Sequence, residues 1–205
     1  NYAEMSDVPD ANQSIWTKEF MQPVHFGVRI PKTKWVALVW PTSSMAQQAS
    51  MSTVAFEDFY FKVCTLDYSR MQKAAEPLVE LITKTEKVEL KGPGTNLTFS
   101  IAGIGAVSCH GERNIPDGEC YTAPVRESME GVVTYNCVSL NQGVEFKNIK
   151  LTVKNGRIVE ADAGVSSAKL NEILDTDEGA RYFGEWSFGY NPHILHPMKN
   201  TLFDE

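Results

Sequence analysis

Three segments of the chain carry carboxylates in settings that suit metal-ion or acid–base chemistry. Glu119 follows Pro116-Asp117-Gly118, a turn that holds the backbone stiffly just before a strand resumes. Glu185 ends an acidic segment that starts at Asp175, and Glu205 follows Leu202-Phe203-Asp204. Hard cations and Zn²⁺ accept carboxylate ligands, and two-metal hydrolases combine several of them with a few imidazoles. The three glutamates are therefore candidate metal ligands.

Residue types and spacing alone favour a structural interpretation of the first two carboxylates. Asp117-Gly118 can simply turn a hairpin, with Glu119 solvated or paired with Arg126. Asp177 and Glu178 fit the first turn of a helix that Thr176 caps, where negative charge is favourable. Glu185 would then lie about two helical turns later and be solvated.

The acidic segment from Asp175 also resembles a calcium-binding loop. Gly179 stands at its fifth place instead of the sixth, and Trp186 occupies the twelfth place, where a bidentate glutamate is required. We therefore reject an EF-hand.

Patterns for other catalytic chemistries do not occur in the sequence. The four histidines, His25, His110, His193 and His196, lack H-x-x-x-H spacing and are interpreted as surface or core residues. No G-x-S-x-G, G-x-G-x-x-G or P-loop is present. The cysteines at 64, 109, 120 and 137 form no C-x-x-C pair, so we expect reduced and mostly buried thiols.

Composition restricts the class of protein and the partners. The chain has 205 residues, 42% hydrophobic and 22% charged, with 26 acidic against 19 basic side chains and a net charge of −7. This balance argues against nucleic acid as a partner. No apolar run approaches the roughly 20 residues that cross a bilayer, so we expect no membrane span. The expected reduced thiols favour a cytoplasmic location. Because the chain starts at Asn1 and stops at Glu205, we expect it to be a piece of a longer protein.

The first part of the chain is predicted to be rich in helices. A buried strand is expected from Lys34 to Trp40, followed by a loop over 41–44 that caps a short helix. Ser52 is a plausible N-cap for a helix that buries Phe56, Phe59, Tyr60 and Val63. The next helix presents Met71, Ala74, Ala75, Leu78, Val79 and Ile82 on one face. The break at 91–94 marks the predicted domain boundary.

The second part changes to the period of two that strands show. We expect strands at 97–101, 132–135 and 144–153, and a two-residue hairpin at Asn155-Gly156, because that pair supplies the positive φ angles of a type I′ turn. Ser166 or Ser167 caps a helix through Leu174. The expected fold class is α/β, as a mixed α+β arrangement. It has the end of a helix-rich α/β domain at 1–91 and a strand-rich metal-site domain with a mixed sheet at 92–205, incomplete at its C-terminus.

Several short motifs, taken together, resemble the thermophilic-type metalloaminopeptidases, the family of aminopeptidases T, S and II. The motifs stand in order along the chain from about Ile30 onward: Asp58-Phe59-Tyr60, Leu66-Asp67-Tyr68-Ser69, Gly92-Pro93-Gly94-Thr95-Asn96-Leu97-Thr98, Asn114-Ile115-Pro116-Asp117-Gly118-Glu119, Tyr121-Thr122-Ala123-Pro124, Leu174-Asp175-Thr176-Asp177-Glu178-Gly179-Ala180-Arg181, Gly184-Glu185 and Asn200-Thr201-Leu202-Phe203-Asp204-Glu205.

The resemblance implies a hydrolase with two divalent ions, Zn²⁺ or Co²⁺, that removes N-terminal residues from peptides, usually as a homodimer. By motif, Glu119, Glu185 and Glu205 take the positions of three metal-site glutamates, and Glu205 is either a ligand or the catalytic proton shuttle. The family's histidine and aspartate ligands and its catalytic tyrosine would follow residue 205. The fragment alone would then be inactive and could lack the metal. Cys120, next to Glu119, could bind a soft metal or be sensitive to oxidation.

Two other functions remain open from the sequence. The glutamates could be structural in a non-catalytic binding or dimerisation module. The chain could also belong to a metallohydrolase that acts on another amide or ester, because such an enzyme would use the same ligands.

Overall fold

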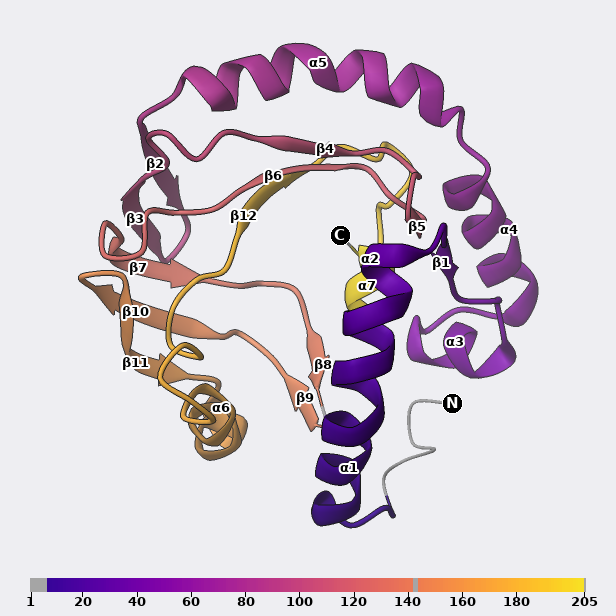
Figure 1. Ribbon diagram of the computed structural model, residues 1–205, viewed down its shortest axis with the longest axis horizontal. Coiled ribbons are helices and arrows are strands. Elements are labelled where there is room, and N and C mark those ends of the chain that lie inside the picture. The colour runs from indigo at the N-terminus through magenta and orange to yellow at the C-terminus, as the bar shows by residue number, and fades with distance from the viewer. Residues whose placement is uncertain (1–6, 142–143, 205) are drawn as a thin grey trace.

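The computed structural model describes residues 7–141 and 144–204. The chain begins with a helical arm made of α1 (Asp10–Trp16), η1 (Thr17–Arg29) and α2 (Ile30–Lys32), and this arm projects from the rest of the molecule (Figure 1). Its large apolar side chains are exposed, among them Trp16, Phe20 and Phe26.

Three helices with well-defined N-caps follow the arm. They are α3 (Ser43–Gln48), α4 (Thr53–Cys64) and α5 (Tyr68–Lys84), and their caps are Thr42, Ser52 and Asp67, whose side chains accept hydrogen bonds from backbone N–H groups of the first turn. The predicted caps of the first two helices are confirmed. The buried strand expected from Lys34 to Trp40 is wrong in length and in burial. Among the described residues only β1 (Ala37–Leu38) forms, paired with the two residues of β5 (Asn114–Ile115), and Val36, Leu38 and Trp40 are exposed.

An antiparallel sheet forms the larger strand-rich unit. Among the described residues it has five strands in the order β11-β10-β7-β3-β2, namely β2 (Lys87–Gly92), β3 (Thr95–Ser100), β7 (Glu130–Thr134), β10 (Lys150–Lys154) and β11 (Arg157–Asp162). The predicted hairpin joins β10 to β11, with Asn155 at φ 48° and Gly156 at φ 74°. The strand expected over 144–153 is interrupted after β9 (Val144–Phe146), where Asn148 has a positive φ angle of 51°.

A smaller antiparallel sheet lies beside this unit. Its order is β12-β6-β4, from β4 (Val107–Cys109), β6 (Glu119–Thr122) and β12 (Trp186–Gly189), and α5 packs against β4 and β6 (Figure 1). A further pair joins β8 (Ser139–Asn141) to β9. Parallel pairing joins β1 to β5, so the expected mixture of parallel and antiparallel strands is divided among separate sheets. The mixed α/β fold class is confirmed.

Two apolar clusters hold the described residues together. One packs the five-stranded sheet, including Phe99 and Val153, against Ile82 of α5 and Leu170 of α6 (Ser167–Leu174). The other joins α3 and α4 to Phe203 of α7 (Thr201–Asp204). The boundary predicted between residues 91 and 92 falls within β2, near the turn to β3, and the division into 1–91 and 92–205 stays a prediction.

The helix predicted from Thr176 toward Glu185 is wrong. The described chain passes from α6, which η2 (Gly164–Ser166) precedes, through turns to β12. Asp177 accepts hydrogen bonds from the N–H groups of Gly179 and Ala180, at 2.7 and 2.8 Å, so its carboxylate closes a turn. The N-cap of α6 is Ser166, but its hydroxyl donates to the Glu145 carbonyl instead of capping the helix.

No helix in the two described stretches is both long enough and apolar enough to cross a membrane.

Candidate metal centre

The register of the three-stranded sheet brings two of the predicted glutamates to one face. Glu119 on the central strand β6 pairs with Gly189 of β12, and Tyr121 pairs with Ser187. Because side chains alternate between the two faces, Glu119, Tyr121 and Ser187 point to the same side. Glu185 precedes β12 and follows this alternation, and its charge acts on Glu119. Two residues that are 66 positions apart in the sequence thus lie on the same side of the sheet.

Glu119 is almost buried, with 8% of its surface exposed. Burial raises the pKa of its carboxyl, and the negative charges of Glu185 and Asp117 raise it further, while hydrogen bonds from Ser187 and Cys109 act in the opposite direction. None of the ion pairs among the described residues includes Glu119 or Glu185. A buried carboxylate in this setting favours the approach of a cation.

The turn before Glu119 is stiff, as predicted, and the buried side chain of Asp117 holds it. Its carboxylate accepts hydrogen bonds from the N–H of Gly111 at 2.7 Å and of Gly118 at 2.9 Å. The Asn191 side chain donates to the Asp117 carbonyl at 2.9 Å, which ties the turn to the segment after β12. The position of Glu119 is therefore fixed from both neighbouring parts of the chain.

The structural interpretation of Glu119, as a solvated or Arg126-paired residue, is wrong. Its carboxylate is buried, and the Arg126 guanidinium lies over the Tyr182 ring, 4.3 Å from the ring centroid. Glu185 is exposed, as the sequence indicated.

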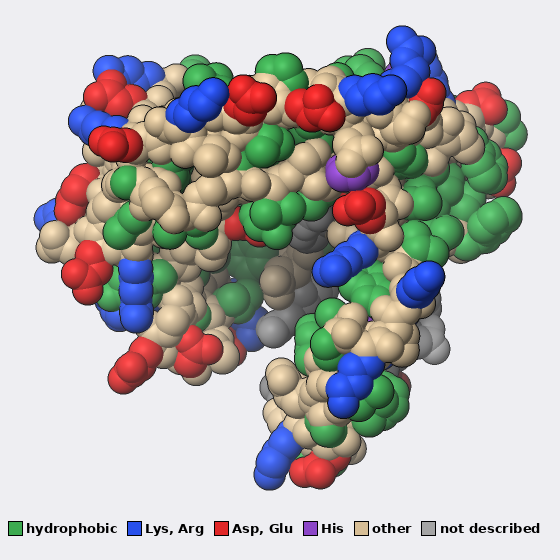
Figure 2. Space-filling view, turned by 45° about the horizontal axis from the view of Figure 1, so that its top comes forward, with side chains coloured by type: hydrophobic (Ala, Val, Ile, Leu, Met, Phe, Trp, Pro, Cys, Tyr) green, Lys and Arg blue, Asp and Glu red, His purple; other side chains and the backbone are tan. Residues whose placement is uncertain are grey.

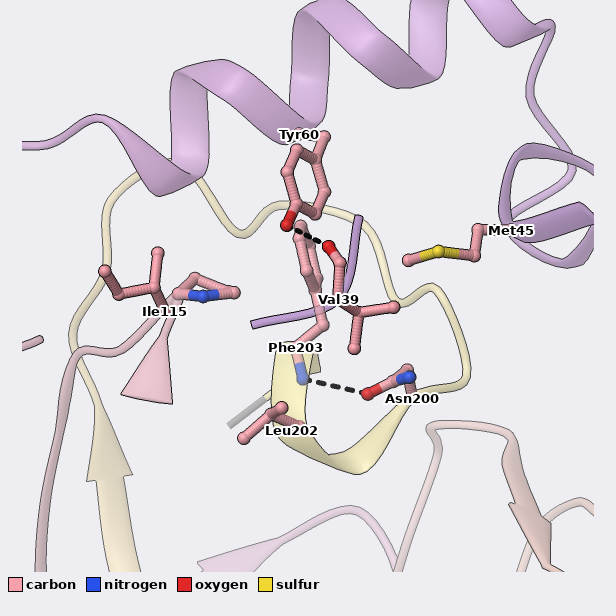
Figure 3. Close-up of a pocket in the computed structure, with 8 residues that line it drawn as sticks. Val39, Met45, Tyr60, Ile115, Asn200, Leu202 and Phe203 are labelled. Carbon is pink, nitrogen blue, oxygen red and sulfur yellow. Dashed lines mark hydrogen bonds between the residues drawn. The ribbon is translucent and has the colours of Figure 1, made fainter. Parts of the chain in front are cut away.

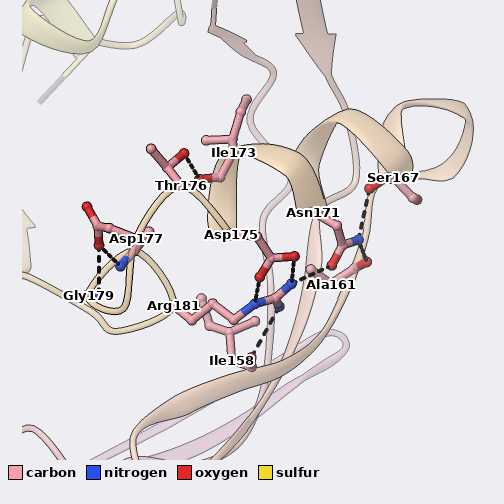
Figure 4. A network of polar contacts seen from close by, with 11 residues as sticks. Ile158, Ala161, Ser167, Asn171, Ile173, Asp175, Thr176, Asp177, Gly179 and Arg181 are labelled. Carbon is pink, nitrogen blue, oxygen red and sulfur yellow. Dashed lines mark hydrogen bonds and ion pairs between the residues drawn. The ribbon is translucent and has the colours of Figure 1, made fainter.

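A polar network fixes the segment that leads to Glu185 (Figure 4). Arg181 donates to both carboxylate oxygens of Asp175, at 2.5 and 2.9 Å, and to the side chain of Asn171 at 3.1 Å. The Ile158 N–H donates to the Arg181 carbonyl at 2.9 Å, so the same residue is also joined to β11. This bidentate pair connects α6, β11 and the turn before Glu185.

The third predicted glutamate, Glu205, lies outside the described residues. The segment before it packs against α3 and α4 through Phe203. A small apolar pocket lies at this contact, and its lining includes Val39, Met45, Tyr60, Ile115, Leu202 and Phe203 (Figure 3). The Tyr60 hydroxyl donates to the Val39 carbonyl, and the Tyr60 and Phe203 rings stack at 5.6 Å between centroids. The side chain of Asp204 accepts from the N–H groups of Met198 and Asn200. These contacts are structural and place the end of α7 next to α4.

The cysteine that faces Glu119 differs from the one that the sequence suggested. Cys120 has its side chain on the opposite face of β6 and is fully buried in the apolar cluster. Cys109 of β4 pairs directly with Glu119. The four cysteines are free thiols, of which Cys120 is buried and Cys137 is exposed, so the expectation that most are buried is wrong.

Sequence reasoning did not identify Ser187, Cys109 or Asn191 as neighbours of the carboxylates. The signal that could have found Ser187 is its position two residues after Glu185, which places both side chains on one face of a strand. The contact of Cys109 depends on strand register, which the sequence does not contain.

The described donor set is incomplete as a metal site but suits a divalent cation. Within residues 7–141 and 144–204, no three His, Cys, Asp or Glu side chains gather closely enough to hold a metal ion. Glu119 and Glu185 nevertheless offer two negatively charged carboxylates, which are hard oxygen ligands, on the same side of the three-stranded sheet. The molecule is hollowed between the sheets and the helical arm, and both acidic and basic side chains lie at the rim of this hollow (Figure 2).

Comparison with known proteins identifies similar sequences. A family model described as thermophilic metalloprotease (M29) matches residues 3–205. Aminopeptidase AmpS from Bacillus subtilis is 35% identical over 125 residues, which are 55% of this chain and 30% of AmpS. Aminopeptidase T from Thermus thermophilus is 37% identical over 131 residues, which are 58% of this chain and 32% of that protein.

Solved structures show the same fold. Wild-type AmpT from Thermus thermophilus superposes with a TM-score of 0.78 at 23% identity, over 99% of this chain and 57% of that one. A 2,5-dihydroxypyridine dioxygenase from Pseudomonas putida KT2440 has a TM-score of 0.57 at 13% identity, over 82% of this chain and 55% of its own. The matched regions thus span about a third of the curated relatives and just over half of the solved ones.

Proposed function

Because the chain belongs to the thermophilic metalloprotease (M29) family, we propose that it carries carboxylate ligands of a metal-dependent aminopeptidase. The observation that carries this proposal is the pairing of β6 with β12, which brings Glu119 and Glu185 to one face in a chain that matches the family over residues 3–205. The relatives named as aminopeptidases support the same activity.

The residues fit such a site in their chemistry. Glu119 and Glu185 would hold the metal, with Glu205 as a further ligand or as the group that carries a proton to the leaving amine. A divalent metal would supply Lewis acidity toward the scissile carbonyl and lower the pKa of a bound water. Asp117 would keep Glu119 in place through its two backbone hydrogen bonds, and the Arg181–Asp175 pair would keep the segment of Glu185 in place.

The finer parts of the proposal come from the family resemblance. They are a pair of Zn²⁺ or Co²⁺ ions, peptides with a free amino terminus as substrates, a homodimer and a cytoplasmic location. Sedimentation of the complete protein and elemental analysis of its bound metal would test the dimer and the ions directly.

The test replaces the two ligands in the complete protein that contains this chain. We expect Glu119→Ala and Glu185→Ala each to reduce bound metal and to lower the rate of peptide hydrolysis by about 100-fold or more, since each removes a ligand. Glu160→Ala is the matched control, because Glu160 is an exposed strand carboxylate of β11 in the other sheet. Metal content would be measured by mass spectrometry, and hydrolysis with free and N-acetylated peptides.

Unchanged metal content and an unchanged rate in both ligand variants would contradict the proposal. Hydrolysis of the N-acetylated peptides at the same rate as the free ones would instead exclude an aminopeptidase and leave another metallohydrolase.

A further inference from the structure

Glu119 occupies the central strand of its sheet, so residues of both neighbouring strands adjoin its side chain. On one side, Cys109 of β4 is its direct partner in the register. On the other side the direct partner is Gly189, which has no side chain. The absence of a side chain at Gly189 leaves room for the diagonal neighbour, Ser187, to reach the carboxylate.

Both neighbours act on the carboxylate of Glu119. The strand register places Cys109 directly opposite Glu119 and Ser187 diagonal to it, and hydrogen bonding from both side chains opposes the rise of the pKa of this carboxyl. An ionised carboxylate has only acceptor sites, about four for its two oxygens, so two donors fix its orientation and still leave lone pairs for a cation.

The two donors carry no charge when they bond to Glu119. They can therefore orient the carboxylate without neutralising it, unlike a lysine or an arginine, which would compete with a metal ion. Ser187 is exposed, so the packing of an apolar core does not account for its position. Its side chain shares a face with Glu185 as well, two residues before it.

We propose that Ser187 and Cys109 are positioning residues that hold the Glu119 carboxylate in the orientation in which it binds the metal. This inference rests on the proposed function, since the cation is the one assigned there. Hydrogen-bond partners of metal ligands commonly change metal affinity by about 10- to 100-fold when they are removed.

The experiment measures Co²⁺ affinity of the complete, metal-free protein by absorption spectroscopy. We expect Ser187→Ala to bind Co²⁺ about 10- to 100-fold more weakly, and Ser187→Thr, which keeps the hydroxyl, to bind within about threefold of wild type. Ser108→Ala is the matched control, because Ser108 is in the same sheet but pairs with Cys120 on the opposite face. Cys109→Ser should likewise retain more affinity than Cys109→Ala, since it keeps a donor.

Urea unfolding of the metal-free variants separates positioning from folding. Equal midpoints for Ser187→Ala and wild type, with a lower Co²⁺ affinity, are the expected result. Wild-type affinity in Ser187→Ala would overturn the inference, and so would an equal loss in Ser108→Ala.

A crystal structure of the metal-free Ser187→Ala variant distinguishes this inference from the proposed function. If the wild-type protein binds no Co²⁺, the proposed function fails. The positioning of Glu119 is then judged from the structure alone: a reoriented carboxylate in the variant supports it, and an unchanged one overturns it.

Discussion

Gly156 is restricted by two independent conditions at a single residue. Its φ angle of 74° lies in the region that favours glycine. In addition, a Cβ atom at this position would collide with the Arg126 carbonyl oxygen, a contact with backbone that cannot move aside as a flexible side chain could. The Asn-Gly turn therefore also serves as a contact point for the loop between β6 and β7.

We predict that Gly156→Ala destabilises the protein much more than Gly103→Ala. Gly103 has the same φ angle of 74° but no heavy atom within 4 Å of its ideal Cβ, so it isolates the cost of conformation, about 1–2 kcal/mol. Gly156→Ala adds a steric cost of about 1–3 kcal/mol. Urea unfolding measures the loss of stability in each variant. An equal loss in Gly156→Ala and Gly103→Ala would show that the loop containing Arg126 moves aside at no energetic cost.

Residues with strong local signals could be predicted from the sequence, and residues that act through pairing could not. The turn at Asn155-Gly156 was predictable because two adjacent residues determine it. Glu119 and Glu185 were identifiable by their motifs, but their shared face was not. Ser187 reaches Glu119 only through the register of β6 with β12, and a shift of one residue would turn it to the other face.

At the scale of elements, the segment from residue 175 to 185 shows how a tertiary contact overrides a local pattern. Its acidic residues suit a helix N-terminus, yet Asp177 closes a turn and Asp175 binds Arg181. Arg181 also bonds to Asn171 of α6 and to Ile158 of β11. These bonds depend on elements that only the complete fold brings together. The local sequence does not contain this information, and the helix predicted from it is therefore wrong.

We predict that the contribution of Asp175 to stability depends on pH. Hydrogen bonding from Arg181 holds the pKa of this carboxyl below its usual range, so its stabilising effect is present above about pH 3.9, the unfolded value, and is lost as pH falls through the lower folded value. The difference in unfolding free energy between wild type and Asp175→Asn should therefore narrow as pH decreases from about 6 toward about 2.

The Arg181→Met background provides the control for this pH dependence. Without the guanidinium, Asp175→Asn should have little effect on unfolding at any pH in the range. If the difference in unfolding free energy caused by Asp175→Asn stays constant with pH, or persists in the Arg181→Met background, the Asp175–Arg181 ion pair is not its cause.

The helices α3, α4 and α5 and the hairpin of β10 and β11 were predicted well, since caps, periodicity and turn residues determine them locally. Ser52 begins α4 as predicted, and three residues of the expected face, Phe56, Tyr60 and Val63, are buried. The short strand β1 was predicted as a longer one. Its run of apolar residues indicated a buried strand, but within the described residues its length follows from the two-residue partner β5.

At the scale of the whole molecule, the site combines parts that the chain brings together from distant positions. The described part supplies two carboxylates on one face of a sheet. It also supplies the apolar contact of Phe203 with α3 and α4, which fixes the segment before Glu205.

We predict that the 205-residue chain by itself binds Co²⁺ weakly and does not hydrolyse peptides, because the two carboxylates of its described part alone form few bonds to a metal. Calorimetric titration of this chain beside the complete protein would measure the difference. The complete protein without added metal is the control for hydrolysis. Tight binding of two ions by the 205-residue chain would show that its own residues suffice.

The pairing of β6 with β12 also has a consequence for the order of events during protein synthesis. Glu119 leaves the ribosome well before residues 186–189, and the strands from β7 to β11 are made in between. Because chains fold from the N-terminus as they emerge, the five-stranded sheet can form while β6 still lacks one neighbour. Glu119 and Glu185 therefore come to the same side of one sheet only after β12 has been translated, and we expect a nascent chain stopped before β12 to lack this arrangement.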